Sequence, residues 1–475
     1  MKNTTGKQKT GLSVAIPPRQ RSYHELVEYL DSHWSPECSE KTLTGMKALD
    51  QAFGNLSQKL STILITGING KSLTAHFASK LLKEEGLAIG TFYSPHMLTY
   101  NERFTINSET ITNKLFIEVA NEVINAAETS GAYVTTREIL TMMALLFFKN
   151  HPADVAILEV SEINVFHPLV LCYPKIVCIT RISEKENSVT NNVDQATMDT
   201  LLSIVKPGAF TVSADQSKIG LQSMQTAVEK LDGVWVMPIR KLAPLAYPFE
   251  QLHGRCAALA ERISQIYVEN VSNKESIIIN NSLLSKRAGR RGRPTLEAKR
   301  QSEMNPRRTI DQFWKETLNT LTGRFQLLDK EKPMVLLDNA SNLDALSNLL
   351  LGIRLLHYQR SLKGLVIIAD CNTICDDMTE FLRLLRYFFK KTSGQIIVCP
   401  VEPAPNKTRS TEFDIDTIVN DIKGMKIKAH AAKNFQEAFQ FASGSVDERN
   451  GLLVITGSSA IINKYWQHKG IKKVA

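Results

Sequence analysis

The feature that most constrains the fold is a short apolar run that ends in a glycine-bracketed turn and continues into a helical pattern. The run is Ile63–Ile65, the turn is Gly67-Ile-Asn-Gly-Lys-Ser72, and Leu73, Phe77, Leu81 and Leu82 follow at helical spacing. This order predicts a strand, a tight loop and a helix N-terminus, which together present backbone N–H groups and the positive end of a helix dipole to phosphate. An ordinary strand–helix turn is the alternative, but all three parts occur in the required order. We interpret the segment as a nucleotide-binding loop.

The side chains of this turn fit the same interpretation. Lys71 supplies a mobile positive charge for the outer phosphates, and Ser72 or Thr74 supplies a hydroxyl near a metal ion. The turn has two residues between its glycines, whereas the common P-loop has four, so it is a shortened form of that loop. The residues of this loop that we expect to bind the nucleotide are Gly67, Asn69, Gly70, Lys71, Ser72 and Thr74.

Apolar runs of strand length alternate with helical patterns in both halves of the chain. The expected strands are Ile63–Ile65, Val155–Val160, Ile176–Thr180, Ala209–Val212, Val335–Leu337, Leu365–Ala369, Ile396–Cys399 and Leu452–Thr456. The expected helices are 22–32, 71–85, 114–128, 138–149, 343–357, 377–391 and 435–442. Such alternation predicts a parallel sheet with helices, twice over, and 475 residues exceed what one core usually supports. We therefore expect an α/β protein of two domains, with ligands at the carboxyl ends of the strands.

Composition is that of an ordinary globular enzyme. The hydrophobic content is 43% and the charged content 22%, and no run approaches the eighteen or so apolar residues of a membrane span. Residues 1–21 carry five Lys or Arg and no acid, without the apolar segment of a secretory signal. We expect a disordered basic tail there, with an organellar transit peptide as the alternative. The seven scattered cysteines fit reduced thiols in the cytoplasm.

The net charge of +9 is concentrated in one segment. Residues 286–308 contain nine Lys or Arg and two Glu, a local charge of +7, and have neither helical period nor strand formers. This segment predicts an exposed, flexible basic insertion. Its Arg291-Gly-Arg-Pro294 core also resembles an AT-hook, whose arginines enter the minor groove of A·T-rich DNA. A solvated basic loop is the stronger interpretation, and contact with nucleic acid is the weaker one.

A series of short motifs in order resembles the folylpolyglutamate synthase branch of the Mur ligase superfamily, which includes bifunctional dihydrofolate synthases. That branch has the loop Thr-Gly-Thr-Asn-Gly-Lys-Gly-Ser-Thr, and this chain has Thr66-Gly-Ile-Asn-Gly-Lys-Ser-Leu-Thr74. The other matches cover residues 22–465: Ser94-Pro-His-Met97, Tyr100-Asn-Glu-Arg-Phe104, Thr135-Thr-Arg-Glu138, Leu158-Glu-Val160, Lys206-Pro-Gly208, Gly323-Arg-Phe325, Leu337-Asp-Asn-Ala-Ser-Asn342 and Val454-Ile-Thr-Gly-Ser458.

The resemblance implies a Mur ligase-like fold and divides the chain. It implies an ATP-binding central domain at 22–282 with a parallel sheet, and a smaller Rossmann-like glutamate-ligase domain at 310–475. The basic insertion then occupies 283–309. The implied reaction joins the carboxylate of a folate to the amine of L-glutamate, using ATP and Mg²⁺ through an acyl phosphate, with dihydropteroate as a further acceptor. A monomer in the cytoplasm, without a membrane partner, is the expected state.

The resemblance also assigns roles to individual residues. Lys71, Glu159 and Arg324 match catalytic positions, and Arg324, Asp338 and Asn342 match residues of the second domain that reach ATP. Ser94 and Glu159 match magnesium ligands, and residues 94–104 match the loop near the folate pocket. A third ligand, a histidine in the family, aligns with Glu186, which either replaces the imidazole or belongs to a mobile charged loop. If it replaces the histidine, Glu159 and Glu186 share one ion with Ser94.

Several departures from the family fall at chemical positions. A carbamylated lysine of the family aligns with Leu201, a histidine with Ser341, and an adenine-side asparagine with Cys256. Where the family has a glycine-rich turn after the position of Glu159, this chain has Ser161-Glu-Ile-Asn-Val165. Leu73 occupies a position where the family has serine. Two alternatives therefore stay open: a catalytically lapsed nucleotide-binding protein, and a ligase for another carboxylic acid. The sequence does not decide which acid is the acceptor, how long the polyglutamate chain is or what the insertion does.

Overall fold

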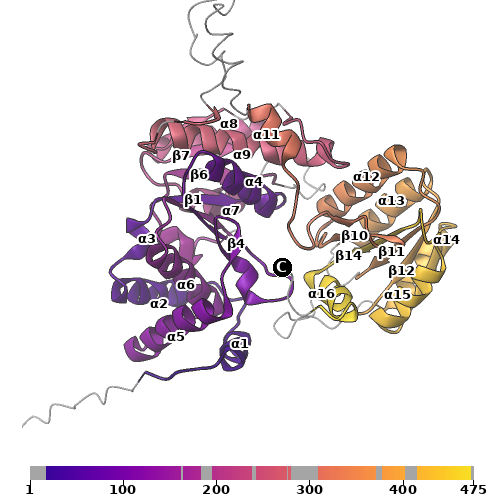
Figure 1. Cartoon of the computed structure of the whole chain (residues 1–475), viewed down its shortest axis with the longest axis horizontal. Coiled ribbons are helices and arrows are strands. Elements are labelled where there is room, and N and C mark those ends of the chain that lie inside the picture. The colour runs from indigo at the N-terminus through magenta and orange to yellow at the C-terminus, as the bar shows by residue number, and fades with distance from the viewer. Residues whose placement is uncertain are drawn as a thin grey trace, which may run out of the picture.

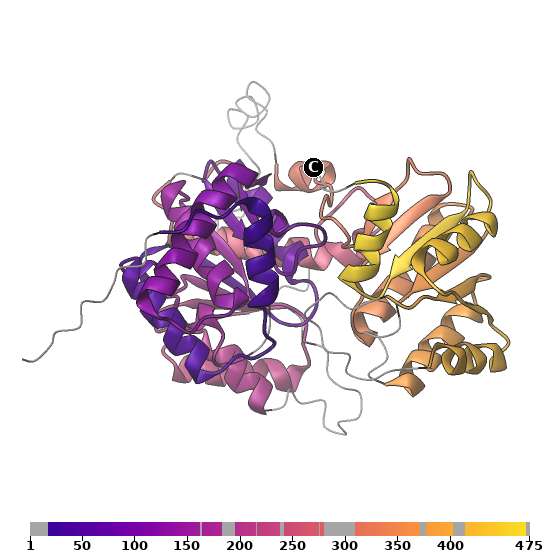
Figure 2. The ribbon, with the colours of Figure 1, turned by 90° about the horizontal axis from the view of Figure 1, so that it is seen from below.

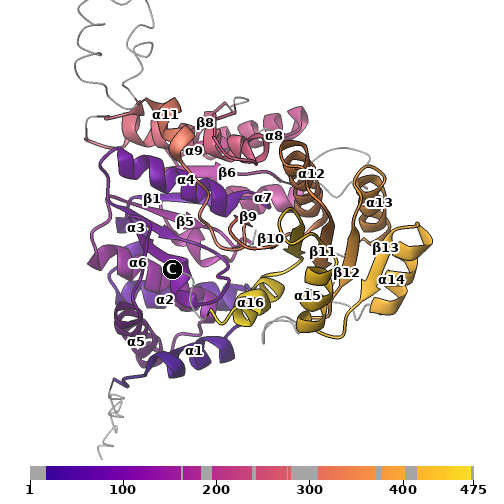
Figure 3. The same cartoon turned by 45° about the vertical axis from the view of Figure 1, so that its right-hand side comes forward.

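The computed structural model describes residues 18–161, 164–182, 195–214, 216–237, 242–274, 276–279, 309–370, 377–401 and 414–471. It contains two α/β units side by side, each with a mostly parallel sheet between layers of helices (Figures 1, 2 and 3). This confirms the predicted fold class. Among the described residues, no helix combines the length and the apolar character that a membrane span requires.

The first unit has an eight-stranded sheet of order β4-β3-β2-β5-β1-β6-β7-β8. Pairing is parallel from β2 to β8, while β3 pairs antiparallel with both β2 and β4. The strands are β1 (Thr62–Thr66), β2 (Ile89–Phe92), β3 (Phe104–Ile106), β4 (Glu109–Thr110), β5 (Val155–Glu159), β6 (Ile176–Ile179), β7 (Phe210–Ser213) and β8 (Val234–Val236).

Helices cover both faces of this sheet because its central strands are apolar on both sides. In β1, Leu64 points to one core, while Ile63 and Ile65 point to the other, as the two-residue period of a strand requires. The face of Leu64 is covered by α1 (Tyr23–Ser32), α2 (Glu40–Ala52), α3 (Leu56–Lys59), α5 (Asn113–Ser130), α6 (Thr136–Asn150), α7 (Gln195–Ser203), α8 (Lys218–Lys230) and the 3₁₀ turn η2 (Pro168–Leu171). The opposite face is covered by α4 (Lys71–Glu84) and α9 (Glu250–Asn270), and the 3₁₀ turn η1 (Tyr100–Arg103) precedes β3.

The second unit has a six-stranded sheet of order β13-β12-β11-β14-β10-β9, parallel except for β9. Its strands are β9 (Gln326–Leu328), β10 (Met334–Asp338), β11 (Leu365–Ala369), β12 (Gln395–Val398), β13 (Lys428–Ala431) and β14 (Leu452–Thr456). One face packs against α12 (Leu343–Gln359), α13 (Met378–Phe389) and α14 (Ile415–Gly424), and the other against α15 (Phe435–Gly444) and α16 (Ser459–His468).

The helix α11 (Ile310–Glu316) packs with the first unit, although the sequence places its residues at the start of the second domain. Trp314 is fully buried in the same core as Ile63, its ring lies edge-on to Phe77 at 5.7 Å, and its Nε1 donates to Glu261 at 2.9 Å. Burial of the Phe313–Trp314 pair therefore moves the predicted boundary at 310 to the segment after α11. The predicted insertion at 283–309 lies outside the described residues, apart from Thr309, which caps α11.

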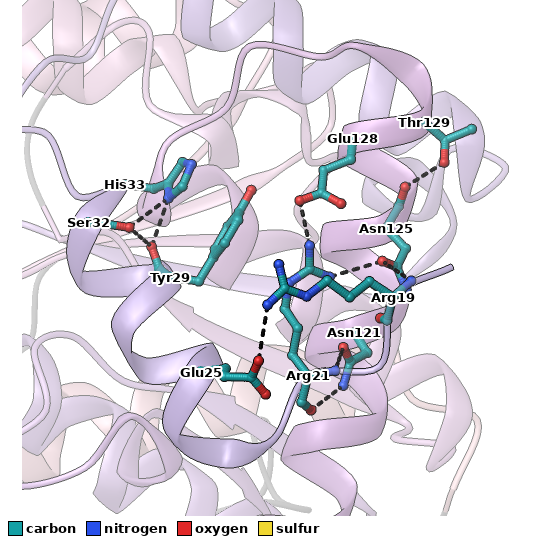
Figure 4. A network of polar contacts seen from close by, with 10 residues as sticks. All are labelled: Arg19, Arg21, Glu25, Tyr29, Ser32, His33, Asn121, Asn125, Glu128 and Thr129. Atoms are coloured by element: carbon teal, nitrogen blue, oxygen red, sulfur yellow. Dashed lines mark hydrogen bonds and ion pairs between the residues drawn. The ribbon is translucent and has the colours of Figure 1, made fainter. Parts of the chain in front are cut away.

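The end of the predicted tail, residues 18–21, is ordered on α5, which corrects the expectation of disorder up to residue 21 (Figure 4). The Arg21 backbone N–H donates to Asn121 at 2.8 Å, and its guanidinium reaches Asn125 at 3.0 Å and Glu128 at 2.5 Å. Its guanidinium carbon also lies 5.3 Å from the centre of the Tyr29 ring. Arg21 can be buried because its charge is paired and its donors are satisfied. Residues 1–17 lie outside the described part.

Replacing Arg21 by Ala is expected to lower the free energy of unfolding by about 1–3 kcal/mol, because Glu128 and Asn125 lose the guanidinium as a partner. Arg19→Ala is the matched control, since the Arg19 side chain is 63% exposed and its ion pair with Glu25 is a surface contact. Urea denaturation of both variants measures the difference. Equal stability of the two variants would contradict the anchoring role.

Candidate active site

A cavity of about 1050 Å³ lies between the two units, above the carboxyl ends of their central strands. The first unit contributes the loop after β1, Ser94 after β2 and Glu159 at the end of β5, and these three strands are neighbours in the sheet. The second unit contributes Arg324, and Asp338 at the end of β10. A site at the strand ends, closed by a second domain, is the position that the sequence pattern predicts.

The loop after β1 has the tight backbone that its glycines suggest. Gly67 has a φ of +120°, and a Cβ there would lie 2.4 Å from the Thr180 hydroxyl, so a side chain would not fit. Gly70 has a φ of +89° and is the N-cap of α4, which begins at Lys71. The helix N-terminus therefore points into the cavity wall, where both Ser72 and Thr74 lie.

The donors of this loop bond to the protein itself. The Lys71 ammonium donates to the carbonyl oxygens of Gly67 at 2.9 Å and Ile68 at 3.0 Å. The backbone N–H groups of Ile68 and Asn69 donate to the Arg181 carbonyl at 3.0 and 3.2 Å. The oxygens of a phosphate bound here would replace these carbonyl oxygens as hydrogen-bond acceptors.

Ser72, Ser94 and Glu159 form the oxygen-rich centre of the cavity. The Ser72 hydroxyl lies 2.9 Å from each carboxylate oxygen of Glu159, and the Ser94 N–H donates to the same carboxylate at 3.2 Å. Glu159 is only 2% exposed. The structure thus brings together two of the three predicted metal ligands and adds Ser72, whose hydroxyl the sequence also proposed for a metal. Glu186, the third predicted ligand, lies outside the described residues.

The chemical type of these donors, hydroxyl and carboxylate oxygens, suits magnesium. Hydroxyl and carboxylate oxygens are the hard ligands that Mg²⁺ takes, and the ion usually uses one or two carboxylates together with substrate phosphates and water. In the parts of the chain that the structure covers, no group of three His, Cys, Asp or Glu side chains could hold a metal by itself. Magnesium bound by these oxygens would take its remaining ligands from substrate phosphates, water or other residues.

Arg103 lines the cavity, and the sequence places it only within the 94–104 loop near the folate pocket, without a role of its own. Its Nη1 donates to the Ser94 hydroxyl at 3.2 Å, and its Nε donates to His96 Nδ1 at 2.9 Å. Burial lowers the pKa of Arg103 to about 10 and that of His96 well below its usual value. Arg103 thus stays charged near neutral pH beside Ser94, while His96 is a neutral acceptor that orients it.

The predicted residues of the second unit reach the cavity in different ways. Arg324 crosses to the first unit, where its Nη2 donates to the Pro95 carbonyl at 2.8 Å. Asp338 accepts the backbone N–H of Phe325 at 2.8 Å, and Asn342 caps α12 by accepting the N–H of Ala345 at 2.9 Å. Burial raises the pKa of the Asp338 carboxyl to about 7, against the opposing effects of the Phe325 N–H and the Arg324 charge.

Replacing Asp338 by Asn is expected to remove a pH dependence of stability. The folded-state pKa of Asp338 lies above its ordinary value, so the stability of the second unit decreases as pH rises from about 4 to about 7. The variant has no such carboxyl, and its amide oxygen still accepts from Phe325. Its stability relative to wild type should rise by about 1.4 kcal/mol per pH unit in that window. Urea unfolding across this range measures it, and a constant difference would show that Asp338 ionises normally.

The two units are also tied together at the loop itself. The amides of Asn69 and Asn342 bond reciprocally at 3.1 and 3.0 Å, and Asn69 also donates to Asp344 at 2.7 Å. The Arg181 guanidinium pairs with the same Asp344 at 2.8 Å. Asn69 and Asn342 were predicted, whereas Arg181 and Asp344 were missed, because no local motif shows that residues 163 apart in sequence meet.

Beyond Glu159, the cavity continues into the first unit past Ser161, His167, Trp34 and Leu140. His167 Nδ1 accepts the N–H of Leu169 at 3.2 Å, so its Nε2 carries the proton toward the Ser161 hydroxyl, also at 3.2 Å. Burial, with the charge of Arg137, lowers the pKa of His167 to about 3. This part of the cavity therefore offers aromatic and neutral polar groups together with the cationic side chain of Arg137.

The departures noted in the sequence occupy defined positions. Leu201 is buried in the core of the first unit, and Ser341 lines the cavity. Cys256 lies on α9 against the turn at Gly70, and burial raises the pKa of its thiol to about 11. Glu138 accepts the N–H of Thr135 at 2.9 Å in a capping box, as expected for a carboxylate in a first helical turn.

The chain is similar in sequence to folate enzymes. It is 27% identical over 221 residues to a dihydrofolate synthase/folylpolyglutamate synthase of Bacillus subtilis (strain 168), a match of 46% of this chain and 48% of the relative. The corresponding protein of Buchnera aphidicola subsp. Baizongia pistaciae is 32% identical over 143 residues, 30% of this chain and 33% of the relative. The match thus spans about half or less of the length of these relatives. No family model matches the chain.

The fold is similar to that of solved structures with these names. The bifunctional folylpolyglutamate synthase/dihydrofolate synthase of Yersinia pestis CO92 superposes with a TM-score of 0.69 at 17% identity, covering 96% of this chain and 100% of that one. The folylpolyglutamate synthase of Mycobacterium tuberculosis complexed with ADP superposes with a TM-score of 0.70 at 16% identity, covering 94% and 98%. The chain is therefore a divergent relative of the dihydrofolate and folylpolyglutamate synthases, and it has their fold.

Proposed function

We propose that this protein is an ATP- and Mg²⁺-dependent ligase that adds L-glutamate to a folate, with dihydropteroate as a further acceptor. One observation carries the proposal. Lys71, Ser72, Ser94 and Glu159 line one cavity, in which the Ser72 hydroxyl and the Ser94 N–H contact Glu159, and Arg324 reaches the same cavity from the other unit. This arrangement supplies charge and hard oxygen ligands where a phosphoryl group would transfer.

Bound ligands in the solved relatives support this choice. One M. tuberculosis structure is complexed with ADP, a structure of a bifunctional folylpolyglutamate synthase/dihydrofolate synthase has Mn, AMPPNP and L-glutamate bound, and an Escherichia coli structure is in complex with DHPP and ADP. A nucleotide, a divalent ion and an amino acid are among the groups that the proposed reaction needs. The cavity of about 1050 Å³ has room for more than one of them.

The roles of the residues follow from their positions. Lys71 moves from the carbonyls of its own loop to the outer phosphates of ATP, and Ser72, Ser94 and Glu159 would hold the magnesium ion, which neutralises phosphate charge when bound. The acceptor lies toward Ser161 and His167, with its carboxylate at Ser94. Arg103 and Arg324 offset the negative charge that meets there, because both approach the Ser94–Pro95 segment.

The two covalent steps then take place within the closed cavity. A carboxylate oxygen of the acceptor attacks the γ-phosphorus of ATP, and ADP leaves. The amine of L-glutamate then attacks the acyl carbon, loses a proton, and inorganic phosphate leaves. Closure of the units protects the acyl phosphate from water, which would otherwise hydrolyse it.

A product assay by mass tests the proposal. Purified protein is incubated with ATP, MgCl₂ and L-glutamate, with tetrahydrofolate or dihydropteroate as acceptor. We expect ADP and an acceptor that is heavier by one glutamyl residue, and Lys71→Ala should abolish both. Formation of neither product with either acceptor would overturn the proposal. Tight ATP binding without turnover would then identify a lapsed relative, in line with Leu201 and Ser341, while turnover with another acid would identify a different ligase.

We also propose that the protein acts as a monomer in the cytoplasm. The described cysteines (Cys38, Cys172, Cys178, Cys256 and Cys399) are free thiols, as is usual in a reducing compartment. Size-exclusion chromatography with light scattering tests the monomer.

A further inference from the structure

A second cavity, of about 400 Å³, lies in the second unit at the end of its sheet that faces away from the candidate active site. Its walls are the end of α13, the loop from α13 to β12 and the loop from α14 to β13. These loops precede their strands, whereas the candidate active site lies where β10 ends. In a parallel sheet the two positions are opposite ends, so this cavity is a separate site.

The walls of this cavity carry positive charge without compensation. Its basic residues are Arg386, Lys390, Lys426 and Lys428, and no Asp or Glu lines it. All four are exposed, and none of them forms an ion pair with another described residue. Four like charges around one hollow repel one another and attract a ligand with several negative charges.

Protection of the sheet edge explains only part of this pattern. Lys428 lies on β13, the edge strand, where a lysine discourages pairing with another sheet. Arg386 and Lys390, however, belong to the end of α13, and Lys426 belongs to a loop. Their convergence on one cavity therefore needs a different explanation.

Exposed tyrosines lie on α13 itself and on its neighbour α12. Tyr387 follows Arg386 on α13 and is 56% exposed, and the Lys391 ammonium lies 4.8 Å from its ring centre. Arg354 of the neighbouring helix α12 lies 5.9 Å from the same ring, and Tyr358, one turn further along α12, is 78% exposed. The helices α12 and α13 lie beside each other on one face of the sheet (Figure 1).

We propose that this surface binds single-stranded nucleic acid, with phosphates in the cationic cavity and bases against Tyr387 and Tyr358. Proteins that bind single strands combine a basic groove for the backbone with aromatic rings on which bases stack. A polycarboxylate or an inorganic polyphosphate would use the charges but not the rings. The residues of this site lie outside 286–308 in the sequence, and the proposed ligase reaction does not use them.

Fluorescence anisotropy with a labelled twelve-nucleotide single strand tests the site in the full-length protein. The test variant replaces Arg386, Lys390, Lys426 and Lys428 by Gln. Its matched control replaces four exposed lysines of the first unit by Gln, with the same change in net charge: Lys47, Lys114, Lys218 and Lys230. We expect the test variant to bind at least about tenfold more weakly than the control, and the slope of log K against log salt to become shallower by about 3, since each contact to a single strand contributes about 0.7.

Tyr387→Ala separates nucleic acid from other polyanions. Loss of one stacked base should weaken oligonucleotide binding about tenfold while leaving competition by inorganic polyphosphate unchanged. Equal affinities of the test variant and its control would overturn the proposal. So would an unchanged oligonucleotide affinity of Tyr387→Ala, because the cavity would then bind any polyanion, including polyglutamate or an anionic vesicle.

Discussion

Replacing Glu159 by Gln is expected to reduce ATP-dependent product formation at least about a thousandfold while the protein remains folded. The amide has almost the same shape and still accepts from Ser72 and from the Ser94 N–H. It has no negative charge, so the centre loses its one described carboxylate for magnesium. Removing a charge that is 2% exposed does not destabilise the fold, because its desolvation cost disappears with it. Steady-state ADP formation, together with a magnesium titration, measures the effect.

Glu138→Gln is the matched control for this variant. Glu138 is also a buried glutamate of the first unit, but its carboxylate caps α6, and a glutamine at the same position also forms a capping box. Its activity should stay close to that of wild type. If Glu159→Gln kept wild-type activity at low magnesium concentration, the metal would not bind at Ser72, Ser94 and Glu159, and this part of the proposed mechanism would be wrong.

Replacing Trp314 by Ala is expected to destabilise the first unit by about 3–5 kcal/mol, which corresponds to a decrease of roughly 10 °C in its melting temperature. Trp314 is fully buried between Phe313 and Phe77, and its indole N–H donates to Glu261. Its removal leaves a large cavity and takes one hydrogen-bond donor away from Glu261. Differential scanning calorimetry measures the change.

Two further variants show where this stability comes from. Trp314→Phe should lose less stability than Trp314→Ala, since the phenylalanine keeps the apolar contacts and gives up only the hydrogen bond. Tyr358→Ala should change nothing measurable, because that aromatic side chain is 78% exposed on the second unit. A Trp314→Ala protein in which only the second unit melts earlier would restore the boundary at residue 310 that the sequence suggests.

The sheets could be predicted from the sequence because their central strands are buried on both sides. Such strands appear as unbroken apolar runs, and the runs at Ile63, Val155, Leu365 and Leu452 mark β1, β5, β11 and β14 to within a residue. The strands β2, β3, β4, β8, β9 and β13 were not predicted. Of these, β4, β8, β9 and β13 lie at the edges of their sheets, are short and carry exposed or partly exposed residues. The inner strands β2 and β3 are buried, but they are only four and three residues long and contain Gly or Thr, so neither forms an unbroken apolar run.

The same distinction applies to the candidate site. Lys71, Ser72 and Glu159 lie at ends of buried strands or in the loop after one, so local pattern and resemblance indicate them together. Arg181 and Asp344 come into contact only when one unit packs on the other. No motif near either residue in the sequence predicts that they pair. Likewise, the burial of Arg21 depends on Glu128 and the asparagines of α5, which a count of basic residues in the tail does not show.

Arg181 contacts residues on both sides of the junction between the units. Its backbone carbonyl accepts the N–H groups of Ile68 and Asn69, while its guanidinium pairs with Asp344 at the start of α12. A displacement of the second unit is therefore transmitted to the backbone of the loop through Arg181, in addition to the direct contacts of Asn69. Loop conformation and the angle between the units form one equilibrium, so a ligand that fixes the first also biases the second, and the same coupling free energy acts in reverse.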